Sequence, residues 1–244
     1  MAFRYVDEAL RRIDGLKERQ LPQLTNAANQ LIRTLRSDGM IHIFGTGHSH
    51  LLAEEAFYRA GGLVSVRPIF IEPLMLHESA WGASALERDP DFAKTFMAAQ
   101  PIESRDTVVV VSTSGRNPVP VDVANMSHAK GASVIAITSV AYTRSLSSRH
   151  GSGQFLADVA DVVLNNESDV GDAALTHPKL DTPYCPTSTV IGATLLHAVI
   201  GEAIDQLADE AFPLPILKSG NVDGADAHNL ALIERYLGRN ELLK

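Results

Sequence analysis

The stretch VVVVSTSGRNPVP, residues 108–120, determines the fold class of this chain. Four β-branched apolar residues in a row lack the polar alternation of a half-solvated strand, so they predict a strand buried on both faces of a parallel sheet. Small hydroxyl residues and a glycine follow at once. Pro118 suits the first turn of a helix, where a missing amide hydrogen costs little, and Asn117 stands at the expected N-cap. The stretch therefore predicts a buried strand, a polar turn and a helix.

Strand and helix signals alternate along the rest of the chain. Further strands are expected at 40–45, 63–70, 132–139 and 159–165, and a long apolar helix at about 187–207. Two amphipathic helices that break near Pro22 precede the first strand, and a helix that ends at Gly61-Gly62 follows it. The alternation predicts an α/β protein, a three-layer sandwich whose mostly parallel sheet is covered by helices on both faces. We expect a single domain over residues 1–244, with extra N-terminal helices at about 1–37 and a loop-helix tail at about 211–244.

Composition excludes several classes of protein. Of the 244 residues, 45% are hydrophobic and 20% charged, and the net charge is −8 without any block of Lys or Arg, which argues against a nucleic-acid or anionic-membrane surface. Cys185 is the single cysteine, so no intrachain disulfide forms. The N-terminus lacks an apolar signal-peptide core, and no apolar run approaches the roughly 20 residues of a membrane span. We expect a cytoplasmic protein without a membrane or nucleic-acid partner.

Two strand-to-helix turns carry small polar groups. In GTGHSH, residues 45–50, Gly45 and Gly47 allow close backbone approach to a ligand, while Thr46 and Ser49 offer hydroxyls near a helix start. The second turn is STSGRN, residues 112–117. Each turn alone is explained equally well by helix capping and tight turns, and neither matches a dinucleotide fingerprint or a P-loop. Because ligands of open α/β sheets bind at the carboxyl ends of strands, the two turns together favour a bound anion such as phosphate.

These motifs resemble those of the sugar isomerase (SIS) domain family. The resemblance rests on GTGHS after the first strand, STSGRN after a later one, AITS at 136–139 and PTSTVIGATLLHAV at 186–199, and it covers about residues 25 to 210. The segments SGRNPVP, GDA and SGNVDGAD make the whole chain similar to the UPF0309-type bacterial group of SIS proteins. The resemblance implies a flavodoxin-like sheet and a phosphosugar ligand.

The resemblance also implies site residues. The phosphate-binding set would be Gly47, Ser49, Ser112, Thr113, Ser114 and Asn117. The family usually has threonine at position 117, but an asparagine amide can still donate a hydrogen bond. Phosphoheptose isomerases carry an AEE segment, found here at 53–55, and a histidine on the last long helix, which His197 matches.

An aldose–ketose isomerase needs a base that removes a proton next to a carbonyl and an acid for the neighbouring oxygen. Glu54, Glu55, His48 and His197 are the catalytic candidates, although solvent-facing carboxylates and a core histidine would explain them equally simply. A second group of candidates comprises His50, His77, Glu78, Lys218 and His228. C-terminal segments of multimeric SIS proteins often complete the neighbouring subunit's site, which is why the last two are included.

The leading functional prediction is a sugar-phosphate isomerase that uses general acid–base catalysis. A sugar-phosphate lyase or etherase, and a non-catalytic phosphosugar sensor, remain alternatives. The H-x-H spacing of His48 and His50 leaves a metal-dependent hydrolase as a further alternative. No cofactor is expected, although zinc would be compatible because some phosphoheptose isomerases bind it. A phosphorylated sugar is the expected partner, and pairing through the N-terminal helices predicts a homodimer or homotetramer.

Overall fold

Five parallel strands form the central sheet of the computed structural model, which describes residues 3–244. They are β1 (Ile41–Gly45), β2 (Val66–Ile69), β3 (Thr107–Val111), β4 (Ser133–Thr138) and β5 (Val162–Asn165). Their order, β2-β1-β3-β4-β5, is that of flavodoxin-like sheets. Pro68 lies in β2, where the edge position tolerates a residue without an amide hydrogen. The predicted α/β class with a parallel sheet is confirmed.

The valines of β3 explain why this strand shows no polar alternation. Val109 and Val111 are buried in the core on one face of the sheet, and Val108 and Val110 in the core on the other face. Successive side chains of a strand point to opposite faces, so a strand covered on both sides needs apolar residues at every position.

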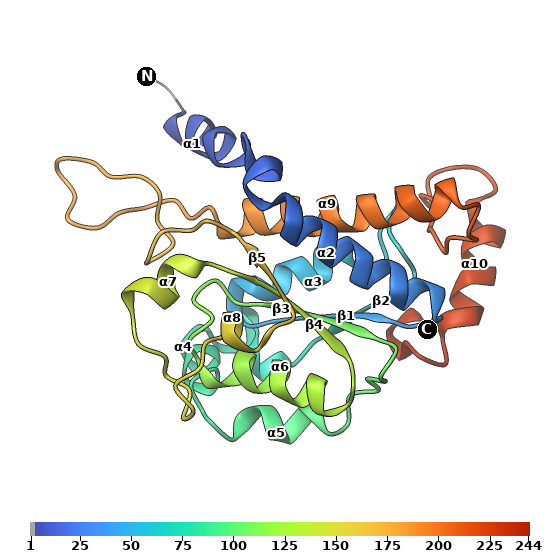
Figure 1. The fold of residues 1–244 in the computed structure, drawn as a ribbon, viewed down its shortest axis with the longest axis horizontal. Coiled ribbons are helices and arrows are strands. Elements are labelled where there is room, and N and C mark those ends of the chain that lie inside the picture. Colours follow the sequence, from blue (N-terminus) through green and yellow to red (C-terminus); the bar gives the residue numbers. More distant parts are fainter. Residues whose placement is uncertain (1–2) are drawn as a thin grey trace.

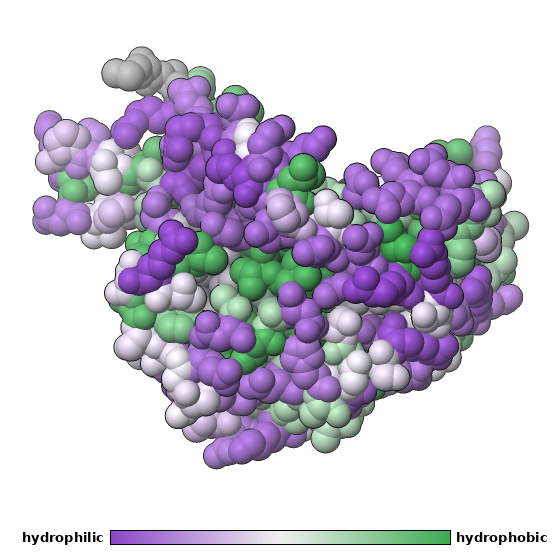
Figure 2. Space-filling model, viewed as in Figure 1, coloured by the Kyte–Doolittle hydropathy of each residue, from purple (hydrophilic) through white to green (hydrophobic). Residues whose placement is uncertain are grey.

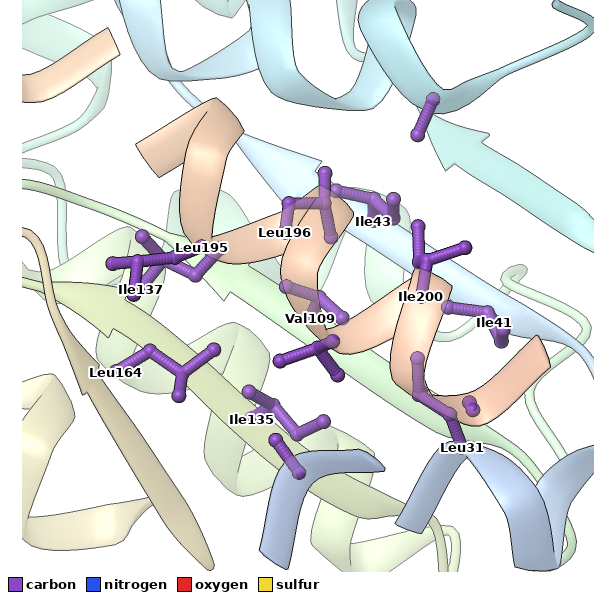
Figure 3. Close-up of a cluster of buried hydrophobic side chains, with 14 of the residues drawn as sticks. Leu31, Ile41, Ile43, Val109, Ile135, Ile137, Leu164, Leu195, Leu196 and Ile200 are labelled. Atoms are coloured by element: carbon purple, nitrogen blue, oxygen red, sulfur yellow. The ribbon is translucent and has the colours of Figure 1, made fainter. Parts of the chain in front are cut away.

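Helices cover the sheet on both faces and give the molecule three layers (Figure 1). One layer contains α2 (Leu16–Arg36), α3 (Leu51–Ala56) and α9 (Ser188–Asp209), and the other contains α5 (Phe92–Met97), α6 (Pro118–Ala129) and α8 (Leu156–Val159). Figure 3 shows Leu195, Leu196 and Ile200 of α9 facing apolar side chains of β1, β3 and β4. The core therefore fixes the helix after β1 and the helix after β3 on opposite faces.

The N-terminal helices contain the predicted break and one more. α1 (Arg4–Ile13) ends before Gly15, whose φ of 66° is left-handed, and the break predicted near Pro22 is a kink of α2 at Gln20. Pro22 is tolerated because it falls in the first turn after the kink. The buried Gln20 side chain donates to the Asn165 carbonyl oxygen at 2.7 Å and accepts from the Asn165 amide at 2.7 Å. The kink thus ties α2 to the edge strand β5.

The segment between β1 and β3 also departs from the prediction. The helix after β1 ends at Ala56 rather than at Gly61-Gly62, because Phe57 is extended and Tyr58 takes a φ of 47°. The unpatterned residues 72–103 form a 3-10 turn, Glu72–Leu74, then α4 (Leu76–Leu86) and α5. α4 packs against the 3-10 turn Gly47–His50 that follows β1.

The remaining helices lie at opposite ends of the strands. α7 (Val140–Ser145) follows β4 at the carboxyl edge, whereas α10 (Ala225–Tyr236) and the C-terminal turn Glu241–Leu243 pack at the amino edge (Figure 1). The antiparallel bridge between Leu63 and Ile216 joins the tail to the chain just before β2. The predicted loop-helix tail is therefore present and lies away from the two polar turns.

Within residues 3–244, α9 is the one helix whose length and composition would let it cross a membrane. Its apolar residues instead pack on the sheet, as expected for a core helix. Figure 2 shows mainly hydrophilic residues over the two helical layers, with hydrophobic residues emerging between them.

Candidate functional site

The two polar turns lie side by side at the carboxyl edge of the sheet. β1 and β3 are neighbours, and their register pairs Gly45 with Val111, so Thr46 and Ser112 follow on adjacent strands. Adjacent strands are about 4.8 Å apart. From β1 the chain continues to β2 on one side, whereas from β3 it continues to β4 on the other side. The helices that follow the two strands, α3 and α6, pack on opposite faces of the sheet. This topological switch point is where open α/β sheets bind their ligands.

Glycine is required at one position in each turn. A Cβ on Gly45 would lie 2.4 Å from the Ser49 carbonyl oxygen. Gly115 has a φ of 55°, and a Cβ there would lie 2.7 Å from Oγ1 of Thr138. Both turns are therefore tighter at these positions than a residue with a side chain allows.

The hydroxyls of the second turn have different partners. Ser112 Oγ accepts from the Gly115 amide at 3.2 Å, and Thr113 Oγ1 accepts from Asn166 Nδ2 at 3.2 Å. Among the described residues, the hydroxyls of Ser114 and Ser49 have no hydrogen-bond partner. Ser112 and Thr113 thus shape the turn, while the hydroxyls of Ser114 and Ser49 are free to donate.

The side chain of Asn117 hydrogen-bonds to Glu87 and Arg149 rather than to the end of the helix. It occupies the N-cap of α6, but its side chain makes no capping bond. Its amide nitrogen donates to Glu87 Oε1 at 2.9 Å, and its Oδ1 accepts from Arg149 Nη1 at 3.2 Å. This placement favours a positioning role over the predicted direct contact with phosphate.

Glu55 and His197 meet between α3 and α9. His197 Nε2 lies 3.2 Å from Glu55 Oε1, and Arg59 also pairs with Glu55. Partial burial lowers the pKa of His197 below its ordinary value, and the charge of Arg59 lowers it further. The imidazole is therefore neutral at pH 7, next to an ionised carboxylate. Glu54 and Glu55 line an open hollow of about 580 Å³ together with Tyr5, Leu51 and Thr189.

Comparison with known proteins identifies the family. The model of the SIS domain matches residues 4–139, which is more than half of the chain. The chain belongs to the SIS-domain family. A UPF0309 protein of Halalkalibacterium halodurans is 50% identical over 241 residues, covering 99% of this chain and 95% of its own length. One from Listeria innocua is 47% identical over 243 residues, covering 100% and 98%. The predicted resemblance is confirmed.

A solved structure shares the fold of this SIS-domain protein. It is a phosphoheptose isomerase, GmhA, from Neisseria gonorrhoeae, with a TM-score of 0.53 and 19% sequence identity. The likeness covers 82% of the SIS-domain protein and 95% of that chain. The common element is the layered arrangement around the parallel sheet.

His48 and His50, two further candidate histidines of the SIS-domain protein, belong to the first turn. His48 is exposed, and His50 Nδ1 contacts the Gly47 carbonyl oxygen while its Nε2 lies 3.9 Å from Glu54. Within residues 3–244, no three His, Cys, Asp or Glu side chains gather in a way that would hold a metal ion. The predictions for zinc and for a metal-dependent hydrolase stay predictions.

The remaining candidate residues of the second group lie at opposite edges of the sheet. His77 and Glu78, 3.9 Å apart and exposed, are on α4 next to the first turn. Lys218 and His228 instead lie in the tail at the amino edge, where His228 Nε2 is 2.8 Å from the Ile216 carbonyl oxygen. Within one chain they are thus separated from the two polar turns.

Sequence reasoning missed several residues at the carboxyl edge. Asn166 holds Thr113, and its Oδ1 accepts from the Ser168 amide at 3.2 Å. Glu87 and Arg149 hold Asn117 from segments that are 30 and 32 residues away in the chain. None of these belongs to a motif, and only the folded chain brings them to the second turn.

Proposed function

We propose that this SIS-domain protein binds a sugar phosphate and interconverts its aldose and ketose forms. The observation that supports phosphate binding is the pair of adjacent turns whose Ser49 and Ser114 hydroxyls have no partner among the described residues. Hydroxyls and backbone amides bind a phosphate without net positive charge, so the chain's charge of −8 is no obstacle. The fold shared with a phosphoheptose isomerase is consistent with the proposal.

The proposed chemistry uses Glu55 and His197. Ser49 and Glu55 belong to one continuous helical stretch, from Gly47 to Ala56, so a sugar held by its phosphate would extend along α3. Glu55, ionised beside Arg59, would take the proton from the carbon next to the carbonyl and return it to the carbonyl carbon. Neutral His197 would exchange a proton with the neighbouring oxygen. Glu54 and His48, both exposed, are the alternatives for these roles.

A ligand-dependent melting experiment tests phosphate binding. Sugar phosphates and their unphosphorylated counterparts would be compared, because a ligand at about 100 times its Kd stabilises the fold by about 2.7 kcal/mol. We expect only phosphorylated sugars to raise the melting temperature, and Ser114→Ala to abolish the effect. Ser37→Ala is the matched control, since Ser37 is exposed after α2 at the amino edge. Equal stabilisation by unphosphorylated sugars would refute the proposal.

Catalysis is tested separately by proton exchange. In D₂O, an isomerase introduces deuterium next to the carbonyl of its substrate, which NMR detects directly. Binding without exchange or turnover of any sugar phosphate would support a sensor instead, and loss of a leaving group would indicate a lyase.

The predicted homodimer or homotetramer remains part of the proposal. Val6 and Leu10 of α1, and Phe3 just before it, are apolar and more than half exposed, at 53%, 60% and 82%. A second copy covering them would hide this apolar surface. Sedimentation of the intact chain, compared with a Val6→Asp, Leu10→Asp variant, measures whether α1 forms that contact.

A further inference from the structure

Three arginines surround the turn Ser112–Asn117 without a partner of opposite charge. Arg88 follows α4, Arg116 belongs to the turn, and Arg149 lies in the loop between α7 and α8. Among residues 3–244, none of the three forms a salt bridge, whereas Arg12, Arg36, Arg59 and Arg235 elsewhere on the chain each pair with a carboxylate. In a protein with a net charge of −8, an unpaired cationic cluster at a ligand edge needs a reason.

The loop that carries Arg149 is hydrogen-bonded to the turn Ser112–Asn117. The Arg149 amide donates to the Arg116 carbonyl oxygen at 2.8 Å, and the Leu156 amide donates to the Gly115 carbonyl oxygen at 2.7 Å. Next to Arg149, His150 Nε2 lies 3.0 Å from Asp122 Oδ1 on α6. These bonds hold the loop at Arg149 and on its C-terminal side, so the guanidinium is presented beside the turn rather than on a free loop.

The side chains of Arg116 and Arg149 keep donors available. Arg116 Nε is buried, and no acceptor satisfies it among the described residues. Arg149 makes one side-chain bond, to Asn117 Oδ1, which leaves most of its donors without a protein partner. Glu87 is the carboxylate next to the cluster, but its Oε1 accepts from Asn117 Nδ2. An unsatisfied buried guanidinium donor is costly unless a ligand satisfies it.

The charges of Arg88 and Arg116 act on the Arg149 guanidinium. Partial desolvation lowers the pKa of Arg149, the like charges of Arg116 and Arg88 lower it further, and Glu87 opposes them. Burial raises the pKa of Tyr142, whose hydroxyl accepts from the Gly171 amide at 2.8 Å, and the charge of Arg116 opposes this rise. The cluster therefore extends from the α4 side of the turn to the loops after β4 and β5.

We propose that Arg116 and Arg149, with Arg88 behind them, form a second anion subsite, and that the ligand is a sugar phosphate bearing a further anionic group. This inference rests on the proposed function, because the monoester occupies the Ser49 and Ser114 donors. The arginines then receive a carboxylate or a second phosphate, groups that guanidinium donors bind in a bidentate manner. Three positive charges exceed what one monoester held by hydroxyls and amides requires.

The test compares three probes by titration calorimetry. Glucose 6-phosphate carries the monoester alone, 6-phosphogluconate adds a carboxylate, and fructose 1,6-bisphosphate adds a phosphate. We expect at least one doubly anionic probe to bind tighter than glucose 6-phosphate by about tenfold or more. Whichever of the two binds tighter identifies the second group as carboxylate or phosphate.

Variants then locate the effect. Arg116→Gln and Arg149→Gln should each weaken binding of the doubly anionic probe much more than binding of glucose 6-phosphate, and so remove most of its advantage. Arg33→Gln, an exposed change of the same charge on α2, is the matched control and should preserve the advantage. Arg149→Lys retains the charge without the planar donors and tests the bidentate contact. Melting without ligand checks that each variant is folded.

Other outcomes overturn the inference in distinguishable ways. Equal affinity for the three probes, or equal losses for all three in Arg149→Gln, would mean that the arginines serve the monoester, and phosphate binding would stand. If other sugar monophosphates stabilise the protein but neither doubly anionic probe binds, the subsite is refuted and the proposed function survives. If no sugar phosphate of any kind binds, both fail.

Discussion

The Nε2 atom of His197 lies 3.2 Å from Oε1 of Glu55, so an acid–base pair spans the contact between α9 and α3. The two residues are 142 positions apart in the chain, and Arg59 touches the same carboxylate. The arrangement joins a neutral imidazole, an ionised carboxylate and a cation within one cluster.

Glu55→Gln should lower turnover of the sugar phosphate by roughly two to four orders of magnitude, because the amide cannot accept the substrate proton. Affinity for the ligand should change little, since the phosphate donors are untouched. The steady-state rate and the exchange of substrate hydrogen in D₂O measure this. Glu202→Gln, on the exposed side of α9, is the control. Full activity in Glu55→Gln would transfer the role of base to Glu54.

Arg59→Gln should raise the pKa of His197 towards its ordinary value of about 6.5. In the parent protein, burial and then Arg59 lower this pKa, so the neutral form persists to lower pH and the acidic limb of the rate profile lies below that value. Removing the charge shifts the limb to higher pH. NMR titration of the His197 ring measures the pKa directly, and an unchanged or lower value would contradict the assignment.

Gly115→Ala should destabilise the fold by about 1–3 kcal/mol, since the residue would adopt a left-handed φ with its Cβ against Thr138. Phosphate binding should be lost as well, because the turn must open to admit the methyl group. Gly220→Ala is the control, with no heavy atom within 4 Å of the added Cβ. Chemical denaturation measures the stability of the two variants. Equal stability of Gly115→Ala and Gly220→Ala would show that the turn adapts.

Asp106→Asn should destabilise the protein at pH 7 by about 3 kcal/mol, because the substitution breaks a buried charged network. Asp106 accepts from the Met40 amide at 2.8 Å and lies 3.1 Å from His42 Nε2, and Arg239 Nη2 donates to it at 2.7 Å. Asp38→Asn, in an exposed pair with Arg235, is the control and should cost less than about 1 kcal/mol.

The same residue predicts a dependence of stability on pH. Burial raises the pKa of Asp106, but hydrogen bonds from His42, the Met40 amide and the Glu103 amide outweigh burial and lower it to about 2. The carboxylate therefore contributes about 2 kcal/mol above the unfolded pKa of about 3.9, and this is lost as pH falls towards the folded value. Denaturation between pH 5 and pH 2 should show this loss in the parent but not in Asp106→Asn.

The sequence predicts those features that depend on neighbouring residues. Val108 to Val111 indicate a strand buried on both sides, and Pro118 marks the start of the following helix, both of which the structure confirms. The predicted break near Pro22 is present as the kink at Gln20, whereas the break at Gly15, which ends α1, was not predicted. Pro22 is visible in the sequence, but the backbone kink that accommodates it is not.

The site was predictable only in part, for the same reason. Ser49 and Ser114 follow strands and are visible in motifs, so the turns could be proposed before the fold was known. The roles of Asn117 and Arg149 depend on a contact between residues 32 positions apart, within a loop that has no periodicity. Local patterns identify strand ends, whereas the partners that surround them are decided by tertiary packing.

The side-chain amide of Gln20 has a consequence for the open edge of the sheet. It supplies the carbonyl and amide that a sixth strand would present to Asn165, and it does so from within the same chain. An edge strand with free backbone groups is a template for pairing with another molecule. By occupying those groups, a single residue of α2 discourages edge-to-edge association through β5, so copies of this protein would be directed to meet through their helices instead.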